Sequence, residues 1–248
     1  MKTLILPLAA FALLAAPTDG SAQQSLLDRL PPDQFDVVPP TDHVVGEPGA
    51  MKIQQSGCRA LPTGRARRRI VDVAVQERGF FGFSIVDETI TERRSAGPGG
   101  QAAPSPTGSG THSRRRFRRL DPRESERVAA SIGGYWAVTP WGDWILEKQN
   151  EAWNGSGGVG TRWRNPWSAA FLSRVMCEGG LGDANQFQRA IAHHTYIDQA
   201  IRARDRGTTQ SAFVAYDVGE AEIEPGDLLC RGSRPAYRNL AERRRQMG

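Results

Sequence analysis

The sequence is poor in the residues that build metal and redox centres. It contains three cysteines and four histidines among 248 residues. Three cysteines are too few for the disulfide framework that holds many small secreted domains together. No histidine falls in an H-E-x-x-H pattern or at a Cys/His spacing typical of zinc, so no metal site is expected.

One glycine-rich string, residues 155–160, matches the pattern G-x-G-x-x-G. A dinucleotide-binding loop needs a strand before this pattern and a helix directly after it. Here a tryptophan-rich helical segment precedes the string, and residues 161–165 separate it from the next helix. The string is therefore interpreted as a loop, and no cofactor is expected.

Long hydrophobic runs are also missing, except at the N-terminus. The apolar run from Leu4 to Pro17 follows Lys2 and precedes Gly20-Ser21-Ala22, a small-x-small cleavage pattern. Residues 1–22 are predicted to be a signal peptide cleaved after Ala22. The mature protein should then be periplasmic or secreted, with no transmembrane segment.

Lysine is rare, and all but three of the 32 basic residues are arginines. Three arginine clusters stand out, at 67–69, 114–119 and 243–245, and the formal net charge is +5. Such clusters could attract an anionic envelope polymer, or they could be solvated faces in a chain with interspersed acidic residues. Because the chain carries an export signal, no nucleic-acid partner is expected.

The remaining sequence predicts one domain of ordinary size. Residues 23–64 are a proline-containing lead-in, expected to be extended and partly disordered, and residues 65–248 form the domain. Within it, residues 95–113 are rich in Gly, Pro, Ser and Thr and are expected to be a flexible insertion. Helical patterns come first and short β-like runs follow at 212–216 and 227–230, which predicts an α+β fold.

The segment 165–176 carries the first candidate site residue. It reads as a helix entered through Asn165-Pro166, with Ser168 at the start of an i, i+3, i+4 stripe that should be core. A serine at the inward N-terminal end of a helix could be a nucleophile, because the helix dipole favours developing negative charge there. Alternatively, Ser168 satisfies a free backbone N–H in the first turn.

The cysteines and histidines leave further alternatives open. Cys177 is expected on the opposite side of that helix from Ser168, where a disulfide, most readily with Cys230, fits better than a catalytic role. His193 and His194 are adjacent in a helix predicted over 186–204, so they point in different directions. His194 lies on the apolar stripe of that helix and is either a hydrogen-bonded core histidine or a catalytic base.

Five blocks of sequence, taken in order, resemble a bacterial family, domain-of-unknown-function family 2272. They are Arg69-Ile70-Val71 with Phe80-Phe81-Gly82, Tyr135-Trp136, Pro166-Trp167-Ser168-Ala169-Ala170-Phe171, Ala192-His193-His194 with Tyr196-Ile197, and Glu224-Pro225-Gly226-Asp227-Leu228-Leu229-Cys230. The resemblance covers roughly residues 65–248. The family looks related to the papain-like NlpC-type and CHAP-type amidases and peptidases of bacterial cell walls, which implies a helix-then-strands domain.

In those enzymes a cysteine opens a helix, and a histidine on a later strand is the base. The resemblance places Ser168 at the cysteine position and Asp227 near the site mouth, with His194 as the remaining candidate base. The family's candidate histidine strand is expected beyond Gly248, so the domain is predicted to be incomplete at its C-terminus. Because a serine needs an adjacent base far more than a thiol does, this chain is expected to be inactive as written.

The resemblance therefore implies an exported envelope protein with a papain-like, hydrolase-related domain. Its expected partner is peptidoglycan or another envelope polymer with amide bonds, which it would bind or hydrolyse. The alternative is a non-catalytic envelope-binding or scaffolding protein that uses arginine clusters and exposed tryptophans.

Overall fold

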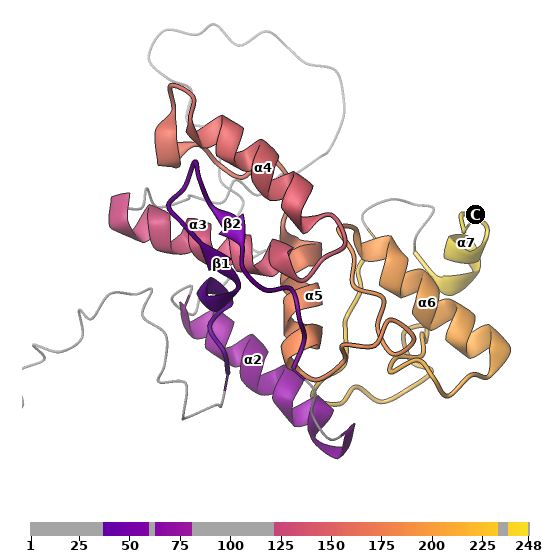
Figure 1. Ribbon diagram of the computed structural model, residues 1–248. Helices are drawn as coiled ribbons and strands as arrows, with labels where there is room; N and C mark the ends of the chain where they lie inside the picture. Colours follow the sequence, from indigo (N-terminus) through magenta and orange to yellow (C-terminus); the bar gives the residue numbers. More distant parts are fainter. Residues whose placement is uncertain (1–36, 60–62, 81–121, 233–237, 248) are drawn as a thin grey trace, which may run out of the picture.

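The computed structural model describes residues 37–59, 63–80, 122–232 and 238–247 (Figure 1). The predicted signal peptide and the predicted insertion at 95–113 lie outside these residues. The described elements, in chain order, are η1 (Pro40–His43), β1 (Val44–Val45), β2 (Lys52–Ile53), η2 (Thr63–Arg65), α2 (Ala66–Phe80), α3 (Pro122–Ala137), α4 (Gly142–Trp153), η3 (Gly158–Gly160), α5 (Ser168–Glu178), α6 (His193–Arg206) and α7 (Leu240–Arg244).

The fold is mostly helical, with one small antiparallel sheet. Its two strands pair Val44 with Ile53 and Val45 with Lys52, so the strands precede the helices rather than follow them. The strands predicted at 212–216 and 227–230 do not form. The backbone of 212–216 bonds to a loop and a helix instead, through Ala212 N–H to Gln186 O and Ala215 N–H to Ala200 O. The described residues contain no sheet of the papain-like kind.

Helix α5 lies at the centre of the structure (Figure 1). Figure 1 shows α2 and α3 on one side of it and α6 on the other. One end of α5 packs on the aromatic residues of α3, where Tyr135 contacts Phe171 edge to face at 5.5 Å between ring centroids. Val175 and Met176, farther along α5, join the core shared with Ile70 and Val73 of α2. The position of α5 thus fixes where its first residue, Ser168, stands.

Residues 37–59 pack against the helices through a few buried side chains, which corrects the expectation of a partly disordered lead-in for this part of it. Val37, Val44 and Met51 are buried. The lead-in lies so close to α3 that a Cβ on Gly134 would meet Pro40 O at 1.9 Å, so only glycine fits there. The sequence does not reveal this packing, because the apolar residues of the lead-in follow no helical or strand period.

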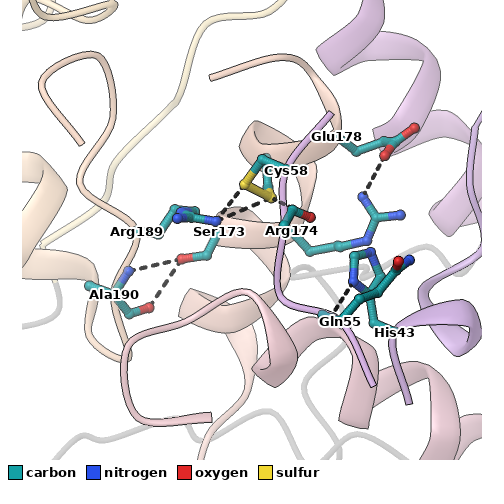
Figure 2. The surroundings of a disulfide bond; sticks show 10 residues. His43, Gln55, Cys58, Ser173, Arg174, Glu178, Arg189 and Ala190 are labelled. Atoms are coloured by element: carbon teal, nitrogen blue, oxygen red, sulfur yellow. Dashed lines mark hydrogen bonds and ion pairs between the residues drawn. A yellow bond between two sulfur atoms is a disulfide. The ribbon is translucent and has the colours of Figure 1, made fainter. Parts of the chain in front are cut away.

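A single disulfide joins the lead-in to α5. It links Cys58 to Cys177 with 4.8 Å between their Cα atoms, and Cys230 is free and exposed (Figure 2). The pairing of Cys177 with Cys230 was therefore the wrong expectation. It assumed that Cys58 lay in a disordered segment, whereas residues 37–59 return past the C-terminal end of α5. A disulfide is consistent with an oxidising, extracytoplasmic location.

A buried ionic cluster lies beside the disulfide. The Glu178 carboxylate accepts hydrogen bonds from Arg69 of α2 at 2.8 Å and from Arg174 of α5 at 3.2 Å. It also accepts the backbone N–H of Val38 at 3.2 Å, while Arg174 donates to Val38 O at 2.5 Å. Figure 2 shows the Arg174–Glu178 pair next to the disulfide. One carboxylate therefore holds three separate segments together.

The disulfide pairing can be tested by labelling thiols in the unreduced, denatured protein. Iodoacetamide should alkylate Cys230 alone, and mass spectrometry should recover a linked peptide pair containing Cys58 and Cys177. Label on Cys58 together with a Cys177–Cys230 peptide pair would contradict the structure.

The ionic cluster predicts a large stability loss for Glu178→Gln. Removing the carboxylate charge takes away the acidic group that both buried arginines bond, Arg69 and Arg174, which should cost about 3–5 kcal/mol in urea unfolding. Glu151→Gln is the matched control, because it breaks the exposed Lys148–Glu151 pair. The control should unfold at the wild-type midpoint, and equal midpoints for all three proteins would refute the role of the cluster.

Candidate active site

The site is built around Ser168, the first residue of α5. The helix begins there, with Trp167 rather than Asn165 at the N-cap position. Ser168 is exposed rather than part of the core stripe, whereas Val175 and Met176 of the same stripe are buried. The first N–H groups of a helix have no carbonyl acceptor one turn earlier. Ser168 thus stands at the positive dipole end of α5.

The Ser168 side chain contacts a histidine. Its Oγ lies 2.8 Å from Nε2 of His193, the first residue of α6. The two residues are 25 positions apart, and two helix N-termini meet at this contact. A serine hydroxyl within hydrogen-bond reach of an imidazole nitrogen is the geometry of a nucleophile and its general base.

The other nitrogen of His193 has its own partner. Nδ1 forms a short hydrogen bond with the hydroxyl of Tyr196, one turn farther along α6. In the tautomer with the proton on Nδ1, the imidazole donates to Tyr196 Oη and Nε2 is free to accept the Ser168 proton. Tyr196 is held in turn by stacking on Phe187, with 5.0 Å between ring centroids. Ser168, His193 and Tyr196 therefore form a continuous chain of contacts.

Desolvation, partial at the exposed His193 and stronger at the buried Tyr196, sets the charge state of these contacts. Desolvation lowers the pKa of His193 below its ordinary value of 6.5, so the imidazole is neutral at neutral pH and can accept a proton. Desolvation also raises the pKa of Tyr196 above its ordinary value, with a smaller contribution from Cys230. The phenol therefore stays protonated, and the three groups carry no net charge before reaction.

His194, the histidine predicted to occupy the site, points elsewhere. It is exposed rather than on a buried stripe, because α6 begins at His193 instead of near Gln186. Residues 186–192 are not helical since their backbone groups bond to other segments. Ser173 Oγ donates to Ala190 O at 3.1 Å and accepts from Ala190 N–H at 3.0 Å, as Figure 2 shows.

Asp227 is also placed apart from the serine–histidine pair. Its Oδ1 accepts from Arg67 at 2.8 Å and its Oδ2 accepts from the backbone N–H of Glu224 at 2.9 Å. These contacts lower the pKa of Asp227, the backbone hydrogen bond from Glu224 most of all. Asp227 fastens its turn to the first turn of α2 and contacts neither Ser168 nor His193.

The comparisons with known proteins bear on the same residues. Residues 126–241 match the family model described as an uncharacterized protein conserved in bacteria (DUF2272). The DUF2272 match contains Ser168, His193, Tyr196 and Asp227, but it is narrower than the 65–248 expected and excludes the lead-in and α2. No curated protein and no solved structure matches the chain. No relation of the DUF2272 region to NlpC-type or CHAP-type enzymes is shown.

Sequence reasoning preferred His194 to His193 as the candidate base, and it missed Tyr196 as a site residue. The i, i+3 spacing of His193 and Tyr196 at a helix start was a usable signal, since residues three apart are neighbours on one helix face. What hid it was the predicted helix start seven residues too early. Within the described ranges, no three His, Cys, Asp or Glu side chains gather as a metal site. In the same ranges, no helix has the length and hydropathy needed to cross a membrane.

The partial desolvation of the His193 imidazole, in a residue that is exposed overall, predicts its titration. An NMR titration of the imidazole resonances should give His193 a midpoint below the ordinary value of about 6.5, because desolvation disfavours the imidazolium. His193→Gln identifies the resonance by removing it. A midpoint at or above the ordinary value would contradict the arrangement described here.

Proposed function

We propose that this chain is an exported envelope hydrolase that uses Ser168 as the nucleophile and His193 as the base. The observation that carries the proposal is the 2.8 Å contact between Ser168 Oγ and His193 Nε2. This contact gives Ser168 an adjacent base, which sequence analysis expected to be missing from this chain. The reaction type is attack on the carbonyl carbon of an amide or ester, as the resemblance to papain-like wall enzymes implies.

The proposed reaction has two halves. Ser168 Oγ bonds to the carbonyl carbon while its proton moves to His193 Nε2, giving a tetrahedral oxyanion. The intermediate collapses, the bond to the leaving amine or alcohol breaks, and His193 returns the proton to that group. Water, deprotonated by His193, then attacks the acyl-serine ester, which releases the carboxylic acid and restores Ser168.

Two surrounding features support this chemistry. The first N–H groups of α5 can donate to the developing oxyanion, as can any preorganised set of backbone donors. Tyr196 holds the imidazole through Nδ1, in the position that a carboxylate occupies in Ser-His-Asp triads. A neutral phenol stabilises an imidazolium less than a carboxylate does, which predicts a modest base.

The location and the substrate class rest on other observations. The predicted signal peptide and the Cys58–Cys177 disulfide support an extracytoplasmic protein. In that compartment the abundant acyl substrates belong to the envelope, and the resemblance favours the amide bonds of a wall polymer such as peptidoglycan. A papain-like ancestry would account for a nucleophile that opens a helix.

A non-catalytic envelope-binding role is the second candidate. Trp141 and Trp144 are 62% and 53% exposed in the first turn of α4 and its approach. Exposed aromatic pairs commonly mark contact surfaces. In this alternative the Ser168–His193 contact is a helix-end hydrogen bond without chemical consequence.

The test compares wild type with Ser168→Ala, His193→Gln and His194→Gln in muropeptide release and p-nitrophenyl acetate hydrolysis. Losing the base should lower kcat/KM by about 10²–10⁴-fold, and Ser168→Ala should lower it at least as far. His194→Gln is the matched control and should keep nearly full activity. Wild-type kcat/KM should rise with pH through the lowered pKa of His193 and level off above it.

One result would decide against catalysis, and another would decide against His193 as the base. Equal background rates from wild type and Ser168→Ala would favour the binding role. Activity that is lost in His194→Gln but kept in His193→Gln would restore the base that the sequence predicted and overturn the present assignment.

A further inference from the structure

An apolar groove lies between α2 and α5. Its volume is about 260 Å³. Most of its lining is aliphatic or aromatic, including Val71 and Val75 from α2, Phe171, Leu172 and Val175 from α5, and Leu228 from the turn beside them. Its only charged lining residues are Arg78 and Asp227, and Asp227 is already bound to Arg67.

Ser168 is not one of the residues that line the groove, but it lies about one turn of α5 before Phe171 and Leu172, which do. Residues 168, 171, 172 and 175 share one face of a helix, so the serine stands at the end of the row that lines the groove. The contacts of α2 show which of its ends lies nearest to Ser168. Arg69 bonds Glu178 at the last residue of α5, whereas Glu77 accepts from Tyr135, whose ring lies 5.9 Å from that of Trp167.

Helices α2 and α5 therefore run antiparallel. Val75 and Arg78 lie at the Ser168 end of the groove, and Asp227 lies at the far end beside Arg67. The distance along α5 from Ser168 to Met176 is about 12 Å at 1.5 Å per residue. A chain bonded to a carbonyl at Ser168 could extend along this length.

The lining selects the chemistry of the occupant. Peptide or sugar groups would lose their hydration here without finding hydrogen-bond partners, which is costly. An alkyl chain would gain about 25 cal/mol for each Å² of apolar surface removed from water. The volume is below the usual range of about 300–1,000 Å³ for small-molecule pockets, so it suits one narrow chain.

We propose that this groove binds the apolar acyl chain of the substrate whose carbonyl carbon Ser168 attacks. The assignment rests on the proposed function for its chemistry, and it narrows the substrate to esters or amides with an aliphatic acyl group. Ser168 then attacks at the mouth of the groove, the leaving group departs toward solvent, and the acyl chain stays in place until water releases it.

Binding is measured first, without turnover. Ser168→Ala is titrated with dansyl-labelled undecanoic acid, whose fluorescence rises in an apolar site. The probe should bind saturably, and adding Val75→Glu should weaken it roughly tenfold or more, because a carboxylate then faces the alkyl chain. Val45→Glu is the matched control, since Val45 is an exposed apolar residue on β1, outside the groove lining.

Chain-length preference is measured next in the wild type. The kcat/KM for p-nitrophenyl octanoate should exceed that for p-nitrophenyl acetate by at least about tenfold, since each added methylene can be buried. Val75→Glu should lower kcat/KM for the octanoate and so remove this preference. Val45→Glu should keep the preference.

The outcomes separate the two proposals. Acetate hydrolysis without probe binding or chain-length preference leaves the proposed function standing and overturns the acyl groove. If Val45→Glu lowers the affinity for the probe as much as Val75→Glu does, the acyl groove is also overturned. Displacement of the probe by a soluble muropeptide, with no chain-length preference, identifies a peptide occupant and overturns it. Saturable binding blocked by Val75→Glu, with no hydrolysis of any substrate, supports the groove and refutes the proposed function.

Discussion

The Glu178 carboxylate is the constraint on which the rest of the fold depends. Two arginines are buried beside it, one from α2 and one from α5, and a buried guanidinium without a counter-ion is very costly. Glu178 can satisfy both only if α2 and α5 lie side by side, and its bond to Val38 N–H draws in the lead-in as well. The Cys58–Cys177 disulfide then closes the same junction covalently.

This junction also fixes the position of the opposite, N-terminal end of α5. A helix is rigid over eleven residues, so anchoring Glu178 also places Ser168. The start of α6 is set separately, by the bonds between Ser173 and the backbone of Ala190 and by Arg189, which donates to Cys177 Sγ at 3.3 Å. Ser168 lies on α5, and these contacts hold the segment before α6 against α5, so Ser168 and His193 meet with defined geometry. Figure 2 shows the Ser173 and Arg189 contacts.

The serine–histidine–tyrosine arrangement differs from a carboxylate triad in its electrostatics. A carboxylate would raise the pKa of the histidine and stabilise the imidazolium formed during attack. Here partial desolvation lowers the pKa of His193, and the neutral phenol of Tyr196 contributes orientation without charge. Under the proposed function, such a site would favour substrates bound firmly enough to hold the carbonyl against the serine, and the proposed acyl groove along α5 would provide contact area for that purpose.

The sequence by itself determined the local elements. The apolar spacing and proline or glycine boundaries of α2, α3, α4 and α5 are periodic within each segment, and Ser168 was recognisable at a helix start for that reason. The tertiary structure alone decided which histidine meets Ser168, which cysteine pairs with Cys177, and that residues 37–59 pack against the helices. It also decided that 212–216 has no partner strand. Each of these features depends on contacts between segments that are far apart in the chain. The periodicity of a single segment shows which of its residues share a face, but not which distant segment packs against that face.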